Sequence, residues 1–225
     1  TGLGTLDLKD PRRLGSMSRL LGISNDCSDA AINQIIKLGF SPSDVRHIIP
    51  THLDVDHAGG IVDFPNACVH TLSLEYRAAM SKRTFWDRER YRSNHWSPDT
   101  KWMIHEENHG EPWFGFNAVR EIPGLPPEVL IIPLFGHTQG HFGVAVQLEE
   151  RWLLHAGDAY YDHRELTREG KPLAGLGMLQ RMVHNDYKQA IENQRRLHAL
   201  NLERKEIDIF CAHDSSEFHQ SKQTF

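Results

Sequence analysis

Short apolar or alternating runs along the chain predict strands at 45–50, 68–71, 129–134, 142–148, 151–155 and 207–211. The run over 129–134 is apolar throughout, as expected of a strand buried on both faces. Alternation over 142–148, an acidic turn at Glu149-Glu150 and a returning run over 151–155 predict two neighbouring strands joined by a hairpin.

Helical signals fall between these strands. Ser28 is predicted to cap a helix with three isoleucines on its apolar face and Gly39 just past its end. Residues 41–44 resemble a capping box with proline at the first helical position. Further helices are expected at about 74–80 and 185–200. The alternation of strands and helices predicts a layered α/β domain.

The stretch 82–127 breaks this pattern, because it reads as irregular, polar and rich in tryptophan. One interpretation is a long insertion that packs on itself and covers a flank of the core. The other is the wall of a substrate pocket, since long ordered insertions often border functional sites. The predicted organisation is therefore a single domain over 1–225 with an insertion at about 82–127 flanking the active site.

Length and composition agree with one soluble globular domain: 225 residues, 39% hydrophobic, with a net charge of −5. There is no apolar run of the roughly 20 residues that cross a bilayer and no signal-like start, so no membrane partner is expected. There is also no broad basic stripe, which disfavours a nucleic-acid partner. Three scattered cysteines form no disulfide framework, so a reducing, cytoplasmic location is expected.

The densest chemistry lies in the loop that follows the first predicted strand. His52, Asp54, Asp56 and His57 place four potential metal ligands within six residues, followed by Gly59-Gly60, which would let the backbone turn tightly. In an extended loop alternate residues point the same way, so His52, Asp54 and Asp56 would converge while His57 turns aside. That geometry suits two neighbouring metal ions better than one. The alternative is a polar loop with incidental histidines.

Three more polar residues, His137, Asp158 and His213, each follow a later predicted strand. A lone histidine at a strand end is more often a satisfied polar residue than a ligand. Here the equivalent positions favour a shared site at one sheet edge.

The pattern His52-x-Asp54-x-Asp56-His57, then His137, Asp158 and His213, resembles the HxHxDH…H…D…H pattern of the metallo-β-lactamase superfamily. The resemblance implies an αββα four-layer sandwich. Thr1-Gly2 looks like the end of that family's Asp-Thr-Gly turn, so the chain is expected to lack the first N-terminal strands.

The resemblance also implies a ligand set for two divalent metal ions. His52, Asp54 and His137 would bind the first ion, Asp56, His57 and His213 the second, and Asp158 would bridge them. Asp54 stands where hydrolytic members usually have histidine. A carboxylate there favours iron or manganese more than an imidazole does, although zinc, the first expectation, also accepts aspartate oxygen.

Within the superfamily, two segments are similar to N-acyl homoserine lactone lactonases: Gly157 to Tyr161, and Phe210 to Asp214. This implies a hydrolase that opens a lactone or carboxylic ester of a small molecule, with a metal-bridging hydroxide as nucleophile. Asp56 would help to hold that hydroxide, and Tyr161 would donate a hydrogen bond to the developing oxyanion. Tyr161 could also be a core residue. A homodimer is left open.

Three alternatives remain at this point. A glutathione-type thioesterase shares the fold, but such enzymes usually carry a basic C-terminal extension that does not follow His213 here. A di-iron redox protein would account for Asp54, but its relatives carry a flavin domain, so a separate partner would be needed. A fold that has lost catalysis and only binds a ligand is disfavoured by the intact ligand set.

Overall fold

The computed structural model describes residues 1–19, 26–107, 110–118, 122–167 and 175–218. The chain divides into two units, Thr1–His105 and Glu106–Phe225. The predicted grouping of 1–225 into one domain stays a prediction.

The first unit is built on a parallel sheet of β1 (His47–Ile48), β2 (Cys68–Leu72) and β3 (Lys101–His105), in that order. Cys68 lies beside His47 on one side and Lys101 on the other. Val69 of β2 packs into a buried apolar cluster that also contains Leu53, Ile61, Ala78, Ala79 and Tyr91. The cluster joins the sheet to the helices and to the loop that follows β1.

The described residues of this unit form the α-helices α1 (Thr5–Lys9), α2 (Ala31–Lys37), α3 (Val55–Ala58), α4 (Ser73–Ser81) and α5 (Phe85–Arg90). The short 3-10 segments are Pro11–Arg19, Cys27–Asp29, Pro42–Asp44, Gly59–Asp63 and Ser93–His95. The predicted cap at Ser28 is wrong, because α2 begins at Ala31 and Ser28 belongs to the preceding 3-10 turn, capped by Asp26. The capping box over residues 41–44 is confirmed: Asp44 accepts a hydrogen bond from the Ser41 backbone amide at 3.1 Å.

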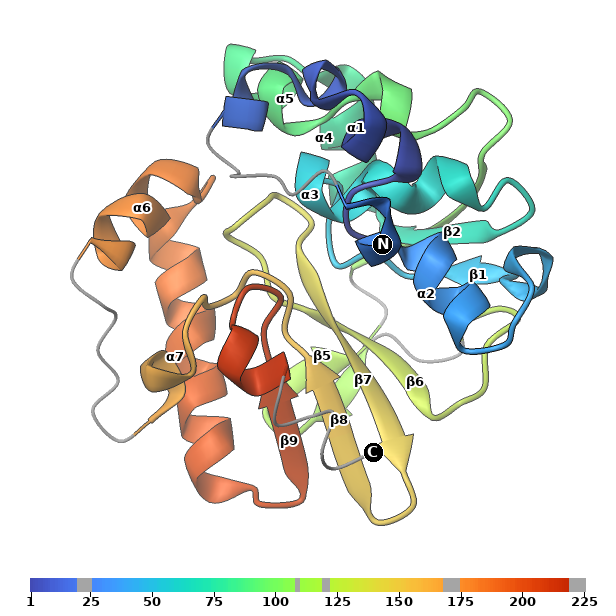
Figure 1. Cartoon of the computed structure of the whole chain (residues 1–225). Helices are drawn as coiled ribbons and strands as arrows, with labels where there is room; N and C mark the ends of the chain where they lie inside the picture. Colours follow the sequence, from blue (N-terminus) through green and yellow to red (C-terminus); the bar gives the residue numbers. More distant parts are fainter. Residues whose placement is uncertain (20–25, 108–109, 119–121, 168–174, 219–225) are drawn as a thin grey trace. The chain divides into compact units, whose positions relative to one another are not determined.

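The second unit contains a four-stranded sheet in the order β6 (Val129–Pro133), β7 (Phe142–Leu148), β8 (Arg151–His155) and β9 (Ile207–Phe210). The predicted hairpin of β7 and β8 is confirmed residue for residue. β7 is antiparallel to both neighbours and β9 is parallel to β8, as Figure 1 shows. Strands β6, β8 and β9 therefore all end at the same edge of the sheet.

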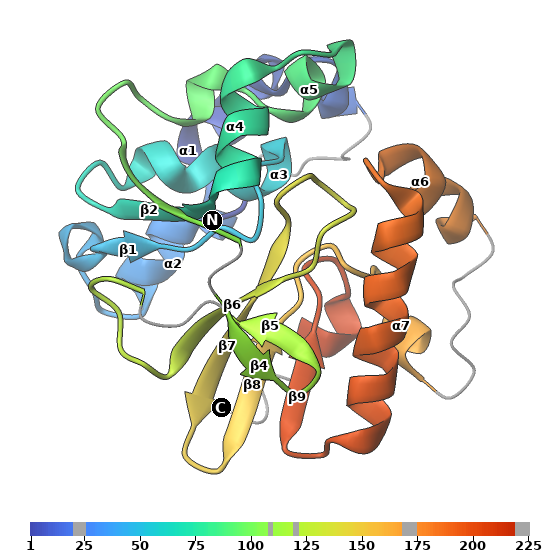
Figure 2. The same cartoon turned by 180° about the vertical axis from the view of Figure 1, so that it is seen from behind.

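Helix α7 (Tyr187–Glu203) covers this sheet through Leu197 and Leu200, which share a buried cluster with Ile207. The small hairpin of β4 (Glu111–Trp113) and β5 (Phe116–Ala118) lies beside β6 (Figure 2). A 3-10 turn, η6 (His163–Leu166), and helix α6 (Leu176–Val183) complete the unit. Within the part of the chain that the structure describes, no helix combines the length and apolar composition of a membrane span.

The stretch 82–127 contains regular elements that its sequence pattern did not predict. It contains α5, the β4–β5 hairpin and β3, and β3 pairs with β2 along its whole length. The insertion at about 82–127 and its place beside the active site stay predictions. Positions 108–109 and 119–121 of the stretch lie outside the described residues.

Candidate metal centre

The loop that follows β1 does not stay extended. Asp54 is the N-cap of α3, and its backbone oxygen accepts hydrogen bonds from the amides of His57 (3.0 Å) and Ala58 (2.9 Å). The helical turn brings His57 beside His52, with ring centroids 4.0 Å apart. The expectation that His57 turns aside is therefore wrong, because it assumed an extended backbone through Asp56.

The four side chains of this loop come together as pairs of imidazole and carboxylate. His52 Nε2 lies 3.6 Å from Asp54 Oδ2, and His57 Nε2 lies 3.8 Å from Asp56 Oδ2. All but Asp56 are buried. The first unit thus presents four potential metal ligands from one short segment.

Neighbouring residues hold this loop in place. Thr51 Oγ1 lies 3.0 Å from His52 Nδ1, so the Nε2 atom of the ring faces Asp54. The fully buried Glu75 of α4 accepts a hydrogen bond from the backbone amide of Leu53 at 2.9 Å. The ring orientation of His52 and the backbone before Asp54 are therefore set by the protein itself.

Gly59 is required for a different reason than predicted. Its φ of −56° is helical, so it does not provide a special turn. A β-carbon there would come within 2.4 Å of Asp7 Oδ2 and 2.8 Å of the Gly4 amide nitrogen. Glycine at this position allows close approach of the segment around Gly4, and the expected role in a tight turn is wrong.

The carboxyl of Asp54 is electrostatically perturbed by its surroundings. Burial raises the pKa of its carboxyl well above the usual value, and the positive charge of Arg90 opposes that effect. Arg90 Nη1 lies 3.1 Å from Asp54 Oδ2. Sequence reasoning missed this pair, since Arg90 is one of several charges on α5 and stands in no motif with Asp54.

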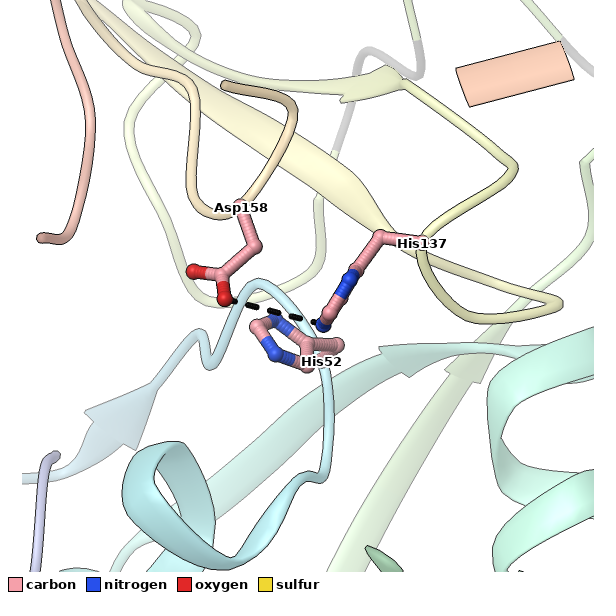
Figure 3. A group of neighbouring side chains, drawn as sticks. All are labelled: His52, His137 and Asp158. Carbon is pink, nitrogen blue, oxygen red and sulfur yellow. Dashed lines mark ion pairs between the residues drawn. The ribbon is translucent and has the colours of Figure 1, made fainter. Parts of the chain in front are cut away.

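In the second unit, His137, Asp158 and His213 follow the ends of β6, β8 and β9, which lie at one edge of the sheet. Asp158 Oδ2 lies 3.6 Å from His137 Nε2, the ion pair drawn in Figure 3, and 3.1 Å from His213 Nε2. His137 and Asp158 are buried, whereas the His213 side chain is 38% exposed. The predicted convergence of these three residues at a sheet edge is thus present within this unit.

A third histidine of this unit, His141, fixes Asp158. Its Nε2 accepts a hydrogen bond from the Asp158 backbone amide at 2.9 Å, so its Nδ1 carries the proton and donates to the Leu134 carbonyl oxygen at 2.8 Å. His141 is fully buried. Because both nitrogens serve the backbone, His141 positions the loop. The sequence places it next to the Gly136–Gly140 turn without indicating this role.

Two further side chains contact His137 through its Nδ1 atom. The Tyr161 hydroxyl lies at 3.2 Å and His184 Nδ1 at 3.1 Å. The Tyr161 ring also stacks on His213, with centroids 5.6 Å apart and planes at 20°. Tyr161 is therefore next to two predicted ligands and is not a core residue remote from them. His184 directly follows helix α6, so a search for polar residues at the ends of predicted strands could not find it.

The donors in each unit fit divalent metal ions. Two ligands bound to one ion at about 2.1 Å lie about 3.4 Å apart in tetrahedral geometry. The nitrogen–oxygen distances within the two units, from 3.1 to 3.8 Å, bracket that value. Neutral imidazole and carboxylate oxygen are also donors that zinc, iron and manganese accept.

The sequence of residues 22–203 matches the family model of the metallo-beta-lactamase superfamily. The chain belongs to this superfamily. A probable metallo-hydrolase of Mycobacterium tuberculosis is 35% identical to it over 225 residues, which is all of this chain and 72% of that protein. An N-acyl homoserine lactonase of Bacillus thuringiensis is 28% identical over 187 residues, covering 83% of this chain and 62% of the lactonase.

A solved N-acyl homoserine lactone hydrolase, with N-hexanoyl-L-homoserine at its catalytic metal centre, superposes with a TM-score of 0.62 and 26% identity. The match covers 86% of this chain and 65% of that one, so the chain spans a little less than two thirds of these lactonases. The predicted metallo-beta-lactamase fold is confirmed, as is the resemblance to lactonases. The relatives' names agree with the predicted class, a metal-dependent hydrolase.

Proposed function

We propose that this metallo-beta-lactamase superfamily chain hydrolyses a lactone or a similar carboxylic ester of a small molecule, using two divalent metal ions. The observation that carries the proposal is the set of paired imidazoles and carboxylates in each unit, with Tyr161 adjoining His137 and His213. The lactonase relatives support the substrate class.

The ligand assignment follows the superfamily pattern. His52, Asp54 and His137 would hold the first ion, Asp56, His57 and His213 the second, and Asp158 would contact both. Zinc is the first candidate, and the carboxylate of Asp54 keeps iron or manganese as alternatives. The alternative function, a di-iron redox protein, would show a redox-active optical spectrum, which a zinc or manganese centre would lack.

When bound, such a pair of ions lowers the pKa of water to about 7 and polarises a carbonyl oxygen. In this proposal, the carboxylates of Asp56 and Asp158 would hold the attacking water and orient it toward the carbonyl carbon. His137 Nδ1 can donate to the Tyr161 oxygen, which leaves the Tyr161 hydroxyl proton to donate to the oxyanion that develops. Such a donor acts in the transition state more than in the ground state.

The test is a panel of lactones, esters and thioesters at pH 7 in a pH-stat, with protein whose metal content has been measured. The expected result is one proton released per lactone opened, with activity lost in Asp158→Asn. Asp208→Asn is the matched control, because Asp208 is an exposed aspartate paired with Arg151 on the sheet. Cleavage of thioesters with no lactone or ester opened would replace the proposal with the thioesterase alternative.

A further inference from the structure

Asp54 of the candidate metal centre is bound to a cation from a separate element. Arg90, the last residue of α5, places Nη1 3.1 Å from Asp54 Oδ2, and the same oxygen lies 3.6 Å from His52 Nε2. The two side chains are largely buried, with 12% of the Asp54 and 18% of the Arg90 side chain exposed. One carboxylate oxygen therefore faces an arginine and a predicted ligand histidine together.

The fold holds Arg90 at this place. Thr84 and Asp87 form a capping box that begins α5, and Arg90 lies in its last turn, where a cation is favoured by the helix dipole. The next residue, Tyr91, is buried in the same apolar cluster as Leu53, the residue before Asp54. Arg90 and Asp54 are therefore each held next to a residue of the same buried apolar cluster.

The charge balance explains why a cation is needed here. Asp54 occupies a position of the motif where a neutral imidazole would add no charge, and the acidic side chains of Asp56 and Glu75 act on it as like charges. A buried carboxylate among other acids is costly unless it is paired. Together, Asp54 and Arg90 carry no net charge, so the pair replaces a histidine without making the loop more anionic.

We propose that Arg90 is a positioning residue for the metal centre: it balances and orients the Asp54 carboxylate so that aspartate can act as a ligand at this position. The inference rests on the proposed function, because it assumes that the loop binds metal. A carboxylate can accept about four hydrogen bonds or bonds to cations, so pairing with Arg90 leaves capacity for an ion. Residues that support a ligand in this way typically change metal affinity by about 10 to 100-fold when removed.

The test is a cycle of four proteins: the unchanged chain, Arg90→Gln, Asp54→His, and the double variant. Zinc affinity is measured by competition with a chromogenic chelator, and bound zinc is counted by mass spectrometry. With Asp54 present, we expect Arg90→Gln to weaken binding of the weaker-bound zinc by about 10-fold or more. In the Asp54→His background, we expect removal of Arg90 to leave zinc affinity unchanged or to raise it, because the cation then only repels the ion.

Arg88→Gln is the matched control, since Arg88 is an exposed arginine on the same helix, and Arg90→Lys should restore part of the affinity by keeping the charge. Thermal melts of the metal-free proteins show whether each variant folds. An equal loss of affinity in both backgrounds, or no loss in either, would overturn the role of Arg90. The proposed function itself is contradicted by a different result: the unchanged chain binds no zinc, manganese or iron, or it binds metal and opens no ester.

Discussion

The three-stranded sheet of the first unit contains a row of hydrogen-bonded histidines whose protonation should destabilise the fold. His70 of the central strand is fully buried. Its Nε2 lies 2.9 Å from His47 Nδ1, and its Nδ1 lies 3.1 Å from His105 Nε2. Burial, and then the neighbouring imidazoles of His105 and His47, lower the pKa of His70 from its ordinary 6.5 to about 4.

The direction of the effect follows from proton linkage. Between pH 6.5 and 4 the unfolded chain binds a proton at His70 that the folded chain excludes, so stability falls as the pH falls through that window. Above pH 6.5 His70 is neutral in both states and contributes no pH dependence. With a folded pKa of about 4, the His70 contribution lowers the free energy of unfolding by ~2 kcal/mol at pH 5 relative to pH 8.

This effect is measured by urea unfolding between pH 8 and pH 5. A chelator keeps the protein free of metal, so that metal binding does not add its own pH dependence to the stability. His70→Gln is expected to be less stable than the unchanged chain at pH 8. Glutamine does not titrate, so the gap between the two proteins should shrink by ~2 kcal/mol on going to pH 5. Parallel stability profiles for the two proteins over this range would refute a buried, neutral His70.

Three other outcomes are expected. Gly136→Ala should cost about 3 kcal/mol or more in urea unfolding, because φ is +128° and a β-carbon would lie 2.2 Å from the Ala190 nitrogen; Gly39→Ala, at φ +86° with open space, should cost less. Tyr161→Phe should lower kcat about 100-fold with zinc content unchanged, and an unaltered kcat would remove Tyr161 from the mechanism. Chelation of the metal should abolish hydrolysis and lower the melting temperature, both restored by zinc, and retained activity without bound metal would contradict the proposed centre.

Elements defined by local patterns were predictable from the sequence. The β7–β8 hairpin was located to the residue because alternation and the turn at Glu149 are local signals, and Glu149 adopts the positive φ of 51° that such a turn uses. β3 was missed because the run from Lys101 to His105 is polar at both ends. Its strand conformation depends on pairing with β2, about thirty residues earlier in the sequence. A strand that forms by pairing with a distant strand need not show an apolar or alternating pattern in its own sequence.

The predicted ligands were found because each follows a strand, whereas the residues that hold them could not be found in that way. Arg90 is 36 residues from Asp54, and His184 is 47 residues from His137. Neither stands in a motif, and both contacts depend on how helices pack onto the loops. The error about His57 has a local cause: Asp54 is the N-cap of α3, so the backbone becomes helical directly after it, whereas the argument from alternation assumes an extended backbone.

His52 in the first unit and His137 in the second have the same arrangement of contacts around their rings. In both, Nε2 faces a carboxylate oxygen at 3.6 Å, and Nδ1 faces a hydroxyl, that of Thr51 at 3.0 Å or that of Tyr161 at 3.2 Å. A histidine that binds metal through Nε2 must carry its proton on Nδ1, and a hydroxyl oxygen can accept a hydrogen bond from that N–H group. Contacts inside each unit therefore hold the two rings in the orientation that ligation through Nε2 requires, with a hydroxyl oxygen placed to accept a proton from Nδ1.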